Sequence, residues 1–242
     1  MDRTKPHPGA LAPETGRAAP PAEAADAEVA AFAAAVRALG PKPQGAARLI
    51  FAMDATMSRQ PTWDAACTLQ ARLFEAAAKV GGLQVQLVYF RGVGETRASR
   101  WLADPAELTR IMSRIACQGG ETQLRKVLLH AERQASAAPV SALVHVGDCL
   151  EEAIDPLCAQ AGALKLLGVR AFMFHEGRDP TAARGFAEIA RITGGAYLPF
   201  APGAAEELGR LLGAVGAWAA GGRPALERRG DAASRLLLGK LG

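Results

Sequence analysis

The chain has 242 residues and a mass of 25.2 kDa, which suits one α/β domain and is short for two. Half of the residues are hydrophobic, and although alanine supplies many of these, Leu, Ile, Val and Phe recur at regular spacing. This pattern excludes a wholly disordered chain. No run of about 18 apolar residues occurs, so we expect no membrane-spanning helix.

The net charge of +4 and the pI of about 9.1 raise the question of a nucleic-acid surface. Residues 221–242 hold five basic and two acidic side chains, so +3 of the excess lies in this segment. Residues 1–45 carry no net charge, because their five basic side chains match five acidic ones. An excess this small and this local does not predict a surface that follows phosphates, and we expect no nucleic-acid partner.

Composition divides the chain into three segments. Residues 1–45 are rich in Ala and Pro and predict a disordered segment with a short helix at 22–39. Residues 46–220 have the alternating pattern of one folded domain. Residues 221–242 return to Gly, Pro and basic residues and predict a tail, in which the leucine run 236–238 could form a short packed element.

The domain alternates apolar runs with amphipathic stretches. Apolar runs and period-two patterns predict strands at 49–53, 83–90, 96–102, 142–146, 169–174 and 196–200. Apolar residues three and four apart predict helices at 61–80, 104–116, 122–135, 153–167, 181–193 and 204–219. The loop at 91–95 is too short for a crossover, so the third strand should be antiparallel. We therefore expect an α/β fold with three layers: a doubly wound, mainly parallel six-stranded sheet with one antiparallel edge strand.

The cysteines give no metal-binding or disulfide pattern. Cys67, Cys117, Cys149 and Cys158 lack a Cys-x-x-Cys spacing, which argues against a zinc knuckle. The N-terminus has no apolar stretch typical of a secretory signal, so we expect a reducing, cytoplasmic location. The bias toward Ala, Gly and Arg is typical of a GC-rich genome and indicates a bacterial source.

Oxygen-bearing side chains gather where the predicted strands end. The first strand runs into Asp54, Thr56 and Ser58, a later loop supplies Thr122, and the fourth strand ends at Asp148. In doubly wound sheets, ligands bind beyond the carboxyl ends of the strands. Carboxylates and hydroxyls suit a hard cation, Mg²⁺ or Mn²⁺, better than zinc. The sequence therefore predicts a divalent-cation site at this edge.

The same residues resemble the metal-ion-dependent adhesion site of von Willebrand factor A (VWA, integrin I-like) domains. The family pattern is Asp-x-Ser-x-Ser after the first strand, a Thr in a later loop and an Asp after the fourth strand. The resemblance covers residues 48–220 and implies a VWA fold of bacterial type. The metal ligands that it implies are Asp54, Thr56 (in place of Ser), Ser58, Thr122 and Asp148. One departure is the turn 147–149, which reads Gly-Asp-Cys where the family often has Ser-Asp-Gly.

The resemblance implies a non-enzymatic adaptor that binds a protein partner. The bound Mg²⁺ or Mn²⁺ would take its last ligand from an Asp or Glu of that partner. The alternative is a Mg²⁺-dependent phosphatase or phosphotransferase with Asp54 as nucleophile. Thr56 occupies the position at which such phosphatases have a second Asp, and no general acid is evident. We therefore expect no catalytic residues. No dinucleotide or P-loop motif occurs, so we expect no organic cofactor.

Individual residues near this edge also have simpler interpretations. Asp54 and Thr122 could each act only as a helix cap. Trp63 could line the partner surface or be a partly buried staple. His145 is expected in the core, and His175 has no paired nucleophile.

Overall fold

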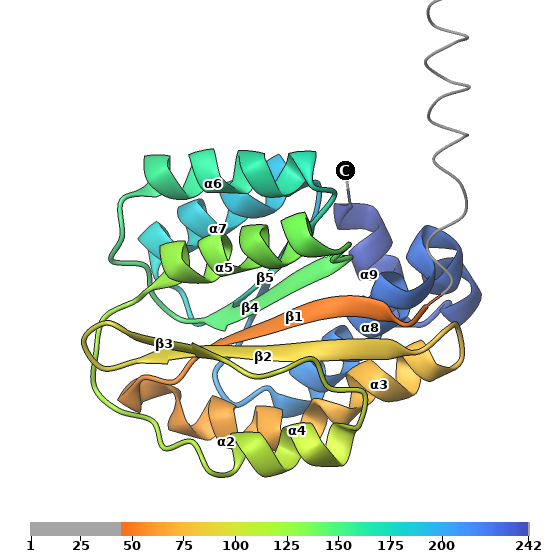
Figure 1. Cartoon of the computed structure of the whole chain (residues 1–242), viewed down its shortest axis with the longest axis horizontal. Coiled ribbons are helices and arrows are strands. Elements are labelled where there is room, and N and C mark those ends of the chain that lie inside the picture. The colour runs from red at the N-terminus through yellow and green to blue at the C-terminus, as the bar shows by residue number, and fades with distance from the viewer. Residues whose placement is uncertain (1–44, 242) are drawn as a thin grey trace, which may run out of the picture. The chain divides into compact units, whose positions relative to one another are not determined.

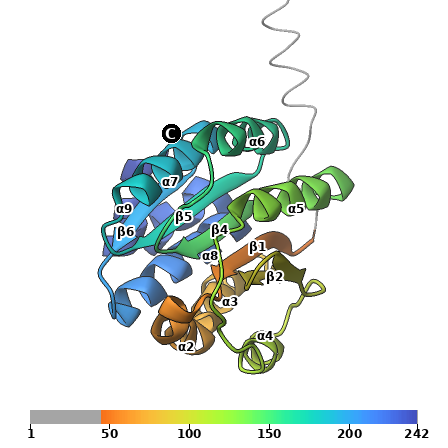
Figure 2. The same ribbon diagram turned by 90° about the vertical axis from the view of Figure 1, so that its left-hand side faces the viewer.

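The computed structural model describes residues 45–241, which form one sheet with helices on both faces (Figures 1 and 2). The predicted disordered segment 1–45 and its helix at 22–39 lie outside the described residues, apart from Gly45. Residues 45–241 form one compact unit, to which residues 221–241 belong.

The sheet has six strands in the order β3-β2-β1-β4-β5-β6. Their bounds are β1 Ala47–Asp54, β2 Leu83–Arg91, β3 Glu95–Ala98, β4 Ala142–Gly147, β5 Arg170–Glu176 and β6 Ala196–Phe200. β1 pairs in parallel with both β2 and β4, whereas β3 pairs antiparallel with β2 at the edge. The predicted fold class is confirmed, because five strands are parallel and one edge strand is antiparallel.

Helices cover both faces of the sheet. Their bounds are α2 Gln60–Leu69, α3 Ala71–Ala78, α4 Pro105–Met112, α5 Leu124–Ala137, α6 Ile154–Leu166, α7 Pro180–Thr193, α8 Ala205–Arg229 and α9 Ala232–Lys240. In Figure 1, α5, α6 and α7 lie above the sheet, and α2, α3, α4 and α8 lie below it. Side chains of α9 join the apolar cluster of the lower layer.

The central position of β1 in the sheet explains why its sequence is continuously apolar. Leu49, Phe51 and Met53 of β1 face the cluster formed with α2, α3 and α8. Ile50 and Ala52 face the cluster formed with α5, α6 and α7. All five side chains are fully buried, as expected for a parallel strand covered on both faces.

Two predicted elements end earlier than expected, each next to a side chain that is hydrogen-bonded to a distant segment. The predicted helix 61–80 is divided at Gln70, whose buried amide donates to the carbonyl of Pro105 and to the Thr109 hydroxyl. The predicted strand 96–102 ends at Ala98, because the Ser99 hydroxyl accepts the hydrogen bond of the Leu87 amide. Both contacts are long-range, so local sequence patterns do not reveal them.

Residues 221–241, which the composition suggests are a tail, form the end of α8 and the whole of α9. α8 was expected to end at residue 219 but continues to Arg229 through a kink at Gly222, where φ is 64°. Pro224 follows this kink, in the first turn of the second helical segment. N–H groups in a first turn have no acceptor within the helix, so the missing N–H of Pro224 costs no hydrogen bond. In the leucine run, Leu237 is fully buried whereas Leu236 is 44% exposed.

Replacing Leu237 with Ala should lower the free energy of unfolding by about 2 kcal/mol, because a methyl-lined void replaces a buried side chain. The matched control is Leu236→Ala on the same helix, which should change it by less than about 0.5 kcal/mol. Urea unfolding followed by circular dichroism measures both. Equal effects of the two variants would show that α9 contributes no core packing.

None of the four cysteines forms a disulfide, and only Cys117 is fully buried, whereas Cys67, Cys149 and Cys158 are half-buried. All four are free, and burial raises the pKa of Cys67 and of Cys117 to about 11 each. A thiol with so high a pKa is a poor nucleophile at neutral pH.

Within residues 45–241, no helix has the length and apolar character needed to cross a bilayer.

Candidate metal centre

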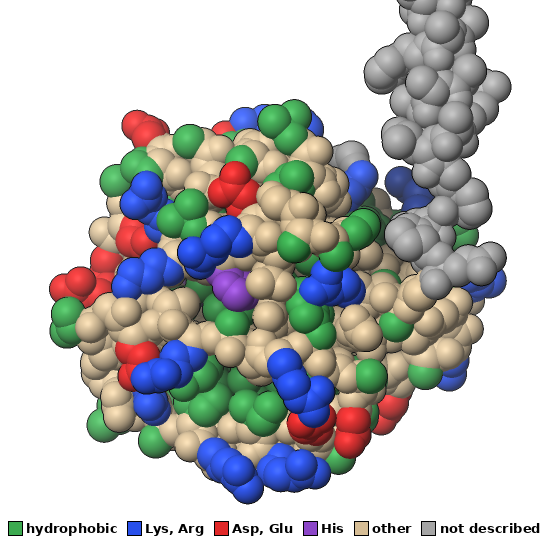
Figure 3. All heavy atoms as spheres, viewed as in Figure 1, with side chains coloured by type: hydrophobic (Ala, Val, Ile, Leu, Met, Phe, Trp, Pro, Cys, Tyr) green, Lys and Arg blue, Asp and Glu red, His purple; other side chains and the backbone are tan. Residues whose placement is uncertain are grey.

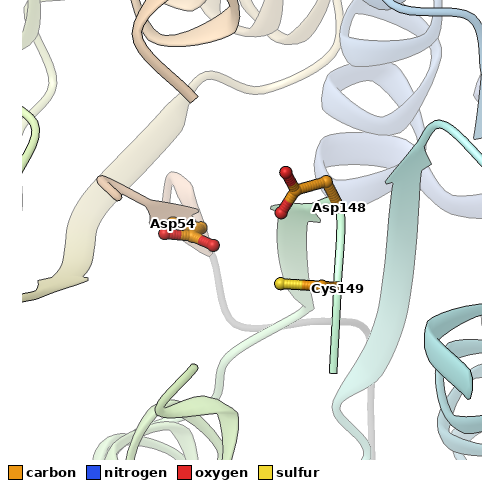
Figure 4. A group of neighbouring side chains, drawn as sticks. All are labelled: Asp54, Asp148 and Cys149. Atoms are coloured by element: carbon orange, nitrogen blue, oxygen red, sulfur yellow. The ribbon is translucent and has the colours of Figure 1, made fainter. Parts of the chain in front are cut away.

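The site lies where two neighbouring parallel strands end. β1 ends at Asp54 and β4 is followed by Asp148, and the two strands pair in register from Leu49 to Met53. Ligand atoms of Asp54, Asp148 and Cys149 all lie within 4.8 Å of one another. The two carboxylates point toward each other in Figure 4. Sheet register therefore joins two acidic residues that are far apart in the chain.

The turn after β1 holds three of the predicted ligands in a connected row. Asp54 Oδ1 accepts a hydrogen bond of 2.7 Å from the Thr56 amide. Thr56 Oγ1 lies 3.4 Å from Ser58 Oγ, and Ser58 Oγ donates to Asp148 Oδ2 at 3.1 Å. The structure thus brings together four of the five predicted residues, Asp54, Thr56, Ser58 and Asp148.

Thr122 is placed differently from the other four. Its amide donates to Glu151 Oε2 at 2.8 Å, and its hydroxyl accepts from the Glu151 amide at 3.0 Å. Within residues 45–241, no hydrogen bond joins Thr122 to Asp54, Ser58 or Asp148. Thr122 therefore fastens the start of α5 to the loop that carries Asp148.

Glu152 completes this attachment. Its carboxylate accepts from the amides of Leu124 and Arg125 at 2.5 and 3.0 Å, which satisfies the first turn of α5. The structural role of the two glutamates was not expected from the sequence. Two glutamates after the end of a strand are only a weak indication of a structural role, because acidic loop residues are usually solvated.

Two carboxylate oxygens of the site, Asp54 Oδ2 and Asp148 Oδ1, are buried and have no hydrogen-bond partner among residues 45–241. Burial raises the pKa of Asp54 to about 6, hydrogen bonds from Thr56 oppose this shift, and the charge of Asp148 adds to it. Buried polar atoms in folded proteins are normally paired. A hard divalent cation between the two carboxylates would satisfy both oxygens, so the residues present fit such an ion.

A buried ion pair that sequence reasoning missed lies beside these residues. Arg59 is only 2% exposed, and its Nη1 binds Glu176 Oε2, which also accepts from the Thr62 hydroxyl. The same Nη1 lies 3.8 Å from Asp148 Oδ2. Glu176 Oε1 accepts from the Gly203 amide at 3.3 Å. The sequence features that could have indicated this ion pair are Arg59 directly after Ser58 and an acidic residue near the end of the fifth strand.

The charges of the site can be counted from these contacts. Asp54, Asp148 and Glu176 supply three negative charges when ionised, and Arg59 supplies one positive charge. Arg59 is committed to Glu176, so the excess of two negative charges falls on Asp54 and Asp148. A divalent cation would balance this excess.

Neighbouring aromatic residues have structural roles. His175 Nε2 lies 3.2 Å from the carbonyl oxygen of Asp148, which can only accept, so Nε2 carries a proton and donates it. His175 Nδ1 lies 2.8 Å from the Tyr197 hydroxyl. His145 is a core histidine, as expected, and burial lowers its pKa to about 3. Trp63 is buried and donates to the Met112 carbonyl at 3.2 Å, which supports the staple interpretation.

Basic side chains are scattered among acidic and apolar ones on the face shown in Figure 3. That face does not show a continuous basic stripe of the kind that follows a nucleic-acid backbone.

Met57, between Thr56 and Ser58, is 68% exposed. An apolar side chain therefore stands beside the oxygen cluster in contact with solvent.

No protein-family model matches the chain, and no curated protein matches it. Solved structures do match its fold. A von Willebrand factor type A protein from Catenulispora acidiphila superposes with a TM-score of 0.58 at 18% identity, over 72% of this chain and 43% of that one. The VWA domain of SpRpn10 gives a TM-score of 0.53 at 12% identity, over 65% of this chain and 89% of the domain.

A third match is an aerotolerance-related membrane protein from Bacteroides fragilis, with a TM-score of 0.51 at 16% identity. It covers 69% of this chain and 96% of that protein. The chain spans less than half the length of the Catenulispora protein. These matches show that the chain has a VWA-like α/β fold, as the sequence resemblance implies.

Proposed function

We propose that this chain is a divalent-cation-dependent protein-binding module. The observation that carries the proposal is the pair of unpartnered carboxylate oxygens, Asp54 Oδ2 and Asp148 Oδ1, at the edge where β1 and β4 end. The VWA-like fold supports it, because this fold is known for metal-dependent protein interaction. The role is that of a non-enzymatic adaptor, with the bound cation completed by an Asp or Glu of the partner.

Each residue of the site would have a distinct task. Asp54 and Asp148 would ligate the cation or hold its waters, and the hydroxyls of Thr56 and Ser58 would add neutral oxygens. Two carboxylates and two hydroxyls leave part of the ion's coordination shell open, and a partner carboxylate can fill it. Thr122 would act through Glu151 by holding the loop that carries Asp148.

The donor chemistry favours Mg²⁺ or Mn²⁺. Cys149 lies close enough to be a ligand, but burial and the nearby charge of Asp148 raise the pKa of its thiol to about 12. Mg²⁺ and Mn²⁺ prefer carboxylate and hydroxyl oxygens to sulfur, so the oxygen atoms of Asp54, Asp148, Thr56 and Ser58 are the favoured ligands. Exposed Met57 would give the partner an apolar contact beside its carboxylate. The expected partner motif is therefore an acidic residue next to an apolar one.

Ser58→Ala should weaken Mn²⁺ binding roughly tenfold, because it removes an oxygen donor and frees Asp148 Oδ2 from its hydrogen bond. Electron paramagnetic resonance of free Mn²⁺ during a titration measures the affinity. Ser113→Ala, at an exposed serine on α4's C-terminal side, is the matched control and should bind Mn²⁺ like the unaltered chain. Undetectable Mn²⁺ binding by the unaltered chain at millimolar concentrations would overturn the metal assignment.

The partner is tested separately with the immobilised full chain. Proteins retained from a native extract in Mg²⁺ should be lost in EDTA and should not bind the Asp148→Asn variant. A synthetic peptide from a retained protein should bind in Mg²⁺ and fail to bind after its Asp or Glu is changed to Asn or Gln. Retention that is undiminished in EDTA would reject a cation-mediated contact even if the chain binds Mn²⁺.

A further inference from the structure

A second recess, unrelated to the metal site, lies between α3 and α8. It encloses about 480 Å³ and is lined by small apolar side chains on its floor and by charged side chains around them. We call this recess the basic groove. Its apolar side chains are those of Ala76, Val80, Ala217 and Ala225. Its charged side chains are those of Arg72, Lys79, Arg210, Arg228 and Arg229, with Glu75 as the one lining carboxylate among the described residues.

The basic groove lies toward the opposite end of the sheet from the carboxylates of the metal site. α3 leads through residues 79–82 to the start of β2, and the carbonyl of Gly82 accepts from the Ala47 amide at the start of β1. In Figure 1, α3 lies near the end where β1 begins, whereas α2 starts near the end where β1 finishes. None of the groove's lining residues belongs to the metal site.

Two glycines on α8 let arginines approach its backbone. A Cβ atom at Gly209 would lie 2.8 Å from Arg72 Nη1, and one at Gly213 would lie 3.1 Å from Arg229 Nη2. These glycines are one helical turn apart. Guanidinium groups from two segments distant in sequence thus lie over the same strip of helix, where any larger residue would crowd them.

Most of the positive charge in the groove has no committed partner. Arg72 pairs with Glu206 at 2.8 Å, and Arg229 uses its Nε to pair with Asp231 at 2.7 Å. No ion pair is found for Lys79, Arg210 or Arg228 in the part of the chain that the structure describes. Five cations against Glu75, Glu206 and Asp231 leave a net charge of +2.

We propose that the basic groove binds a small organic anion that carries two or more phosphate groups. Arginine forks bind phosphate oxygens through paired, charge-assisted hydrogen bonds. The apolar floor would hold the uncharged body of the ligand. The volume is within the range of about 300–1,000 Å³ typical of small-molecule sites, which favours a compact ligand over a length of polymer.

This kind of recognition would leave no phosphate-binding motif in the sequence. Glycine-rich motifs cradle phosphates with consecutive backbone amides, whereas the groove offers side chains from α3 and from both segments of α8. Part of the basic excess of residues 221–242 lies in the basic groove. Arg228 and Arg229 come from that segment and meet Arg72 and Arg210 only in the folded chain.

ADP is the probe, and isothermal titration calorimetry of the full chain in EDTA measures its binding without metal at the first site. ADP should bind and adenosine should not, and raising NaCl from roughly 50 to 300 mM should weaken binding about tenfold, because the charges are exposed. Arg210→Gln and Arg228→Gln should each raise the Kd about fivefold. Neither side chain forms an ion pair with another described residue, so neither change should alter folding.

Arg184→Gln on α7 and Arg125→Gln on α5 are matched controls, since both are exposed arginines outside the groove. Equal weakening by a control variant, or no ADP binding at low salt, would overturn the proposal. Pyrophosphate binding as tight as ADP would show that the apolar floor does not contribute. Affinity for RNA oligonucleotides that rises with their length, or preference for polyglutamate over ADP, would reject a small phosphate ligand. None of these results depends on the metal site.

Discussion

Asp54→Asn is expected to stabilise the metal-free protein at pH 7 and to abolish its stabilisation by Mg²⁺. Burial raises the pKa of Asp54 from 3.8 to about 6, so the folded chain carries an unfavourable buried charge at neutral pH. A shift of about two pKa units corresponds to about 3 kcal/mol, which is the upper limit of the gain. The Asn amide keeps the hydrogen bond from Thr56 and removes the charge.

The pH dependence follows from the direction of this shift. Between pH 4 and 6, the folded state holds a proton on Asp54 that the unfolded state has released. The stability of the metal-free chain should therefore fall as pH rises through this window and stay low above it. Mg²⁺ takes the place of the proton, so its stabilising effect should be larger at pH 7.5 than at pH 4.5.

Thermal unfolding in EDTA and in Mg²⁺ at these two pH values tests both statements. Asp64→Asn, at an exposed aspartate of α2, should show neither effect. Equal stabilisation by Mg²⁺ of the Asp54→Asn variant and the unaltered chain would place the cation elsewhere. A metal-free stability that rises between pH 4 and 6 would contradict the raised pKa of Asp54.

Arg59→Met is expected to lower the free energy of unfolding by about 3–5 kcal/mol, measured by urea unfolding in EDTA. The substitution leaves Glu176 buried without its cation, and the remaining donors, the Thr62 hydroxyl and the Gly203 amide, are neutral. Met fills a similar volume, so the loss reports the missing charge more than missing packing.

The double variant Arg59→Met/Glu176→Gln should recover much of this loss, because it removes both charges of the buried pair. Arg191→Met is the exposed comparison. Its partner Glu188 lies on the surface of α7, and the change should leave the free energy of unfolding nearly unaltered, because water screens an exposed pair. A double variant no more stable than Arg59→Met would show that the ion pair does not account for the effect.

The fold was predictable where one feature dominates a whole element. The run 49–53 is apolar because β1 is covered on both faces, and its end at Asp54 follows directly. The end of β3 was not predictable, since it depends on a hydrogen bond between Leu87 and the Ser99 hydroxyl of another segment. The break at Gln70 has no local sequence signal such as Gly or Pro. The packing of residues 221–241 was hidden by Gly and Pro residues that the kink requires.

The candidate site divides in the same way. Asp54, Thr56 and Ser58 lie in one short turn, so their spacing alone groups them. Arg59 and Glu176 are 117 residues apart, and only the register of the sheet shows that they meet. Thr122 is not the helix cap that the sequence allowed, because α5 begins at Leu124 with Gln123 as its N-cap. Its bond to Glu151 depends on how two loops pack.

The position of β1 and β4 in the sheet has a mechanical consequence. β1 is bonded in parallel to β2 and β4, and β4 is bonded to β1 and β5. A force applied at Asp54 or Asp148 along the strands would load β1 and β4 lengthwise. The hydrogen bonds on both sides of each strand would then have to shear together, so these carboxylates stand on two firmly held strands of the sheet.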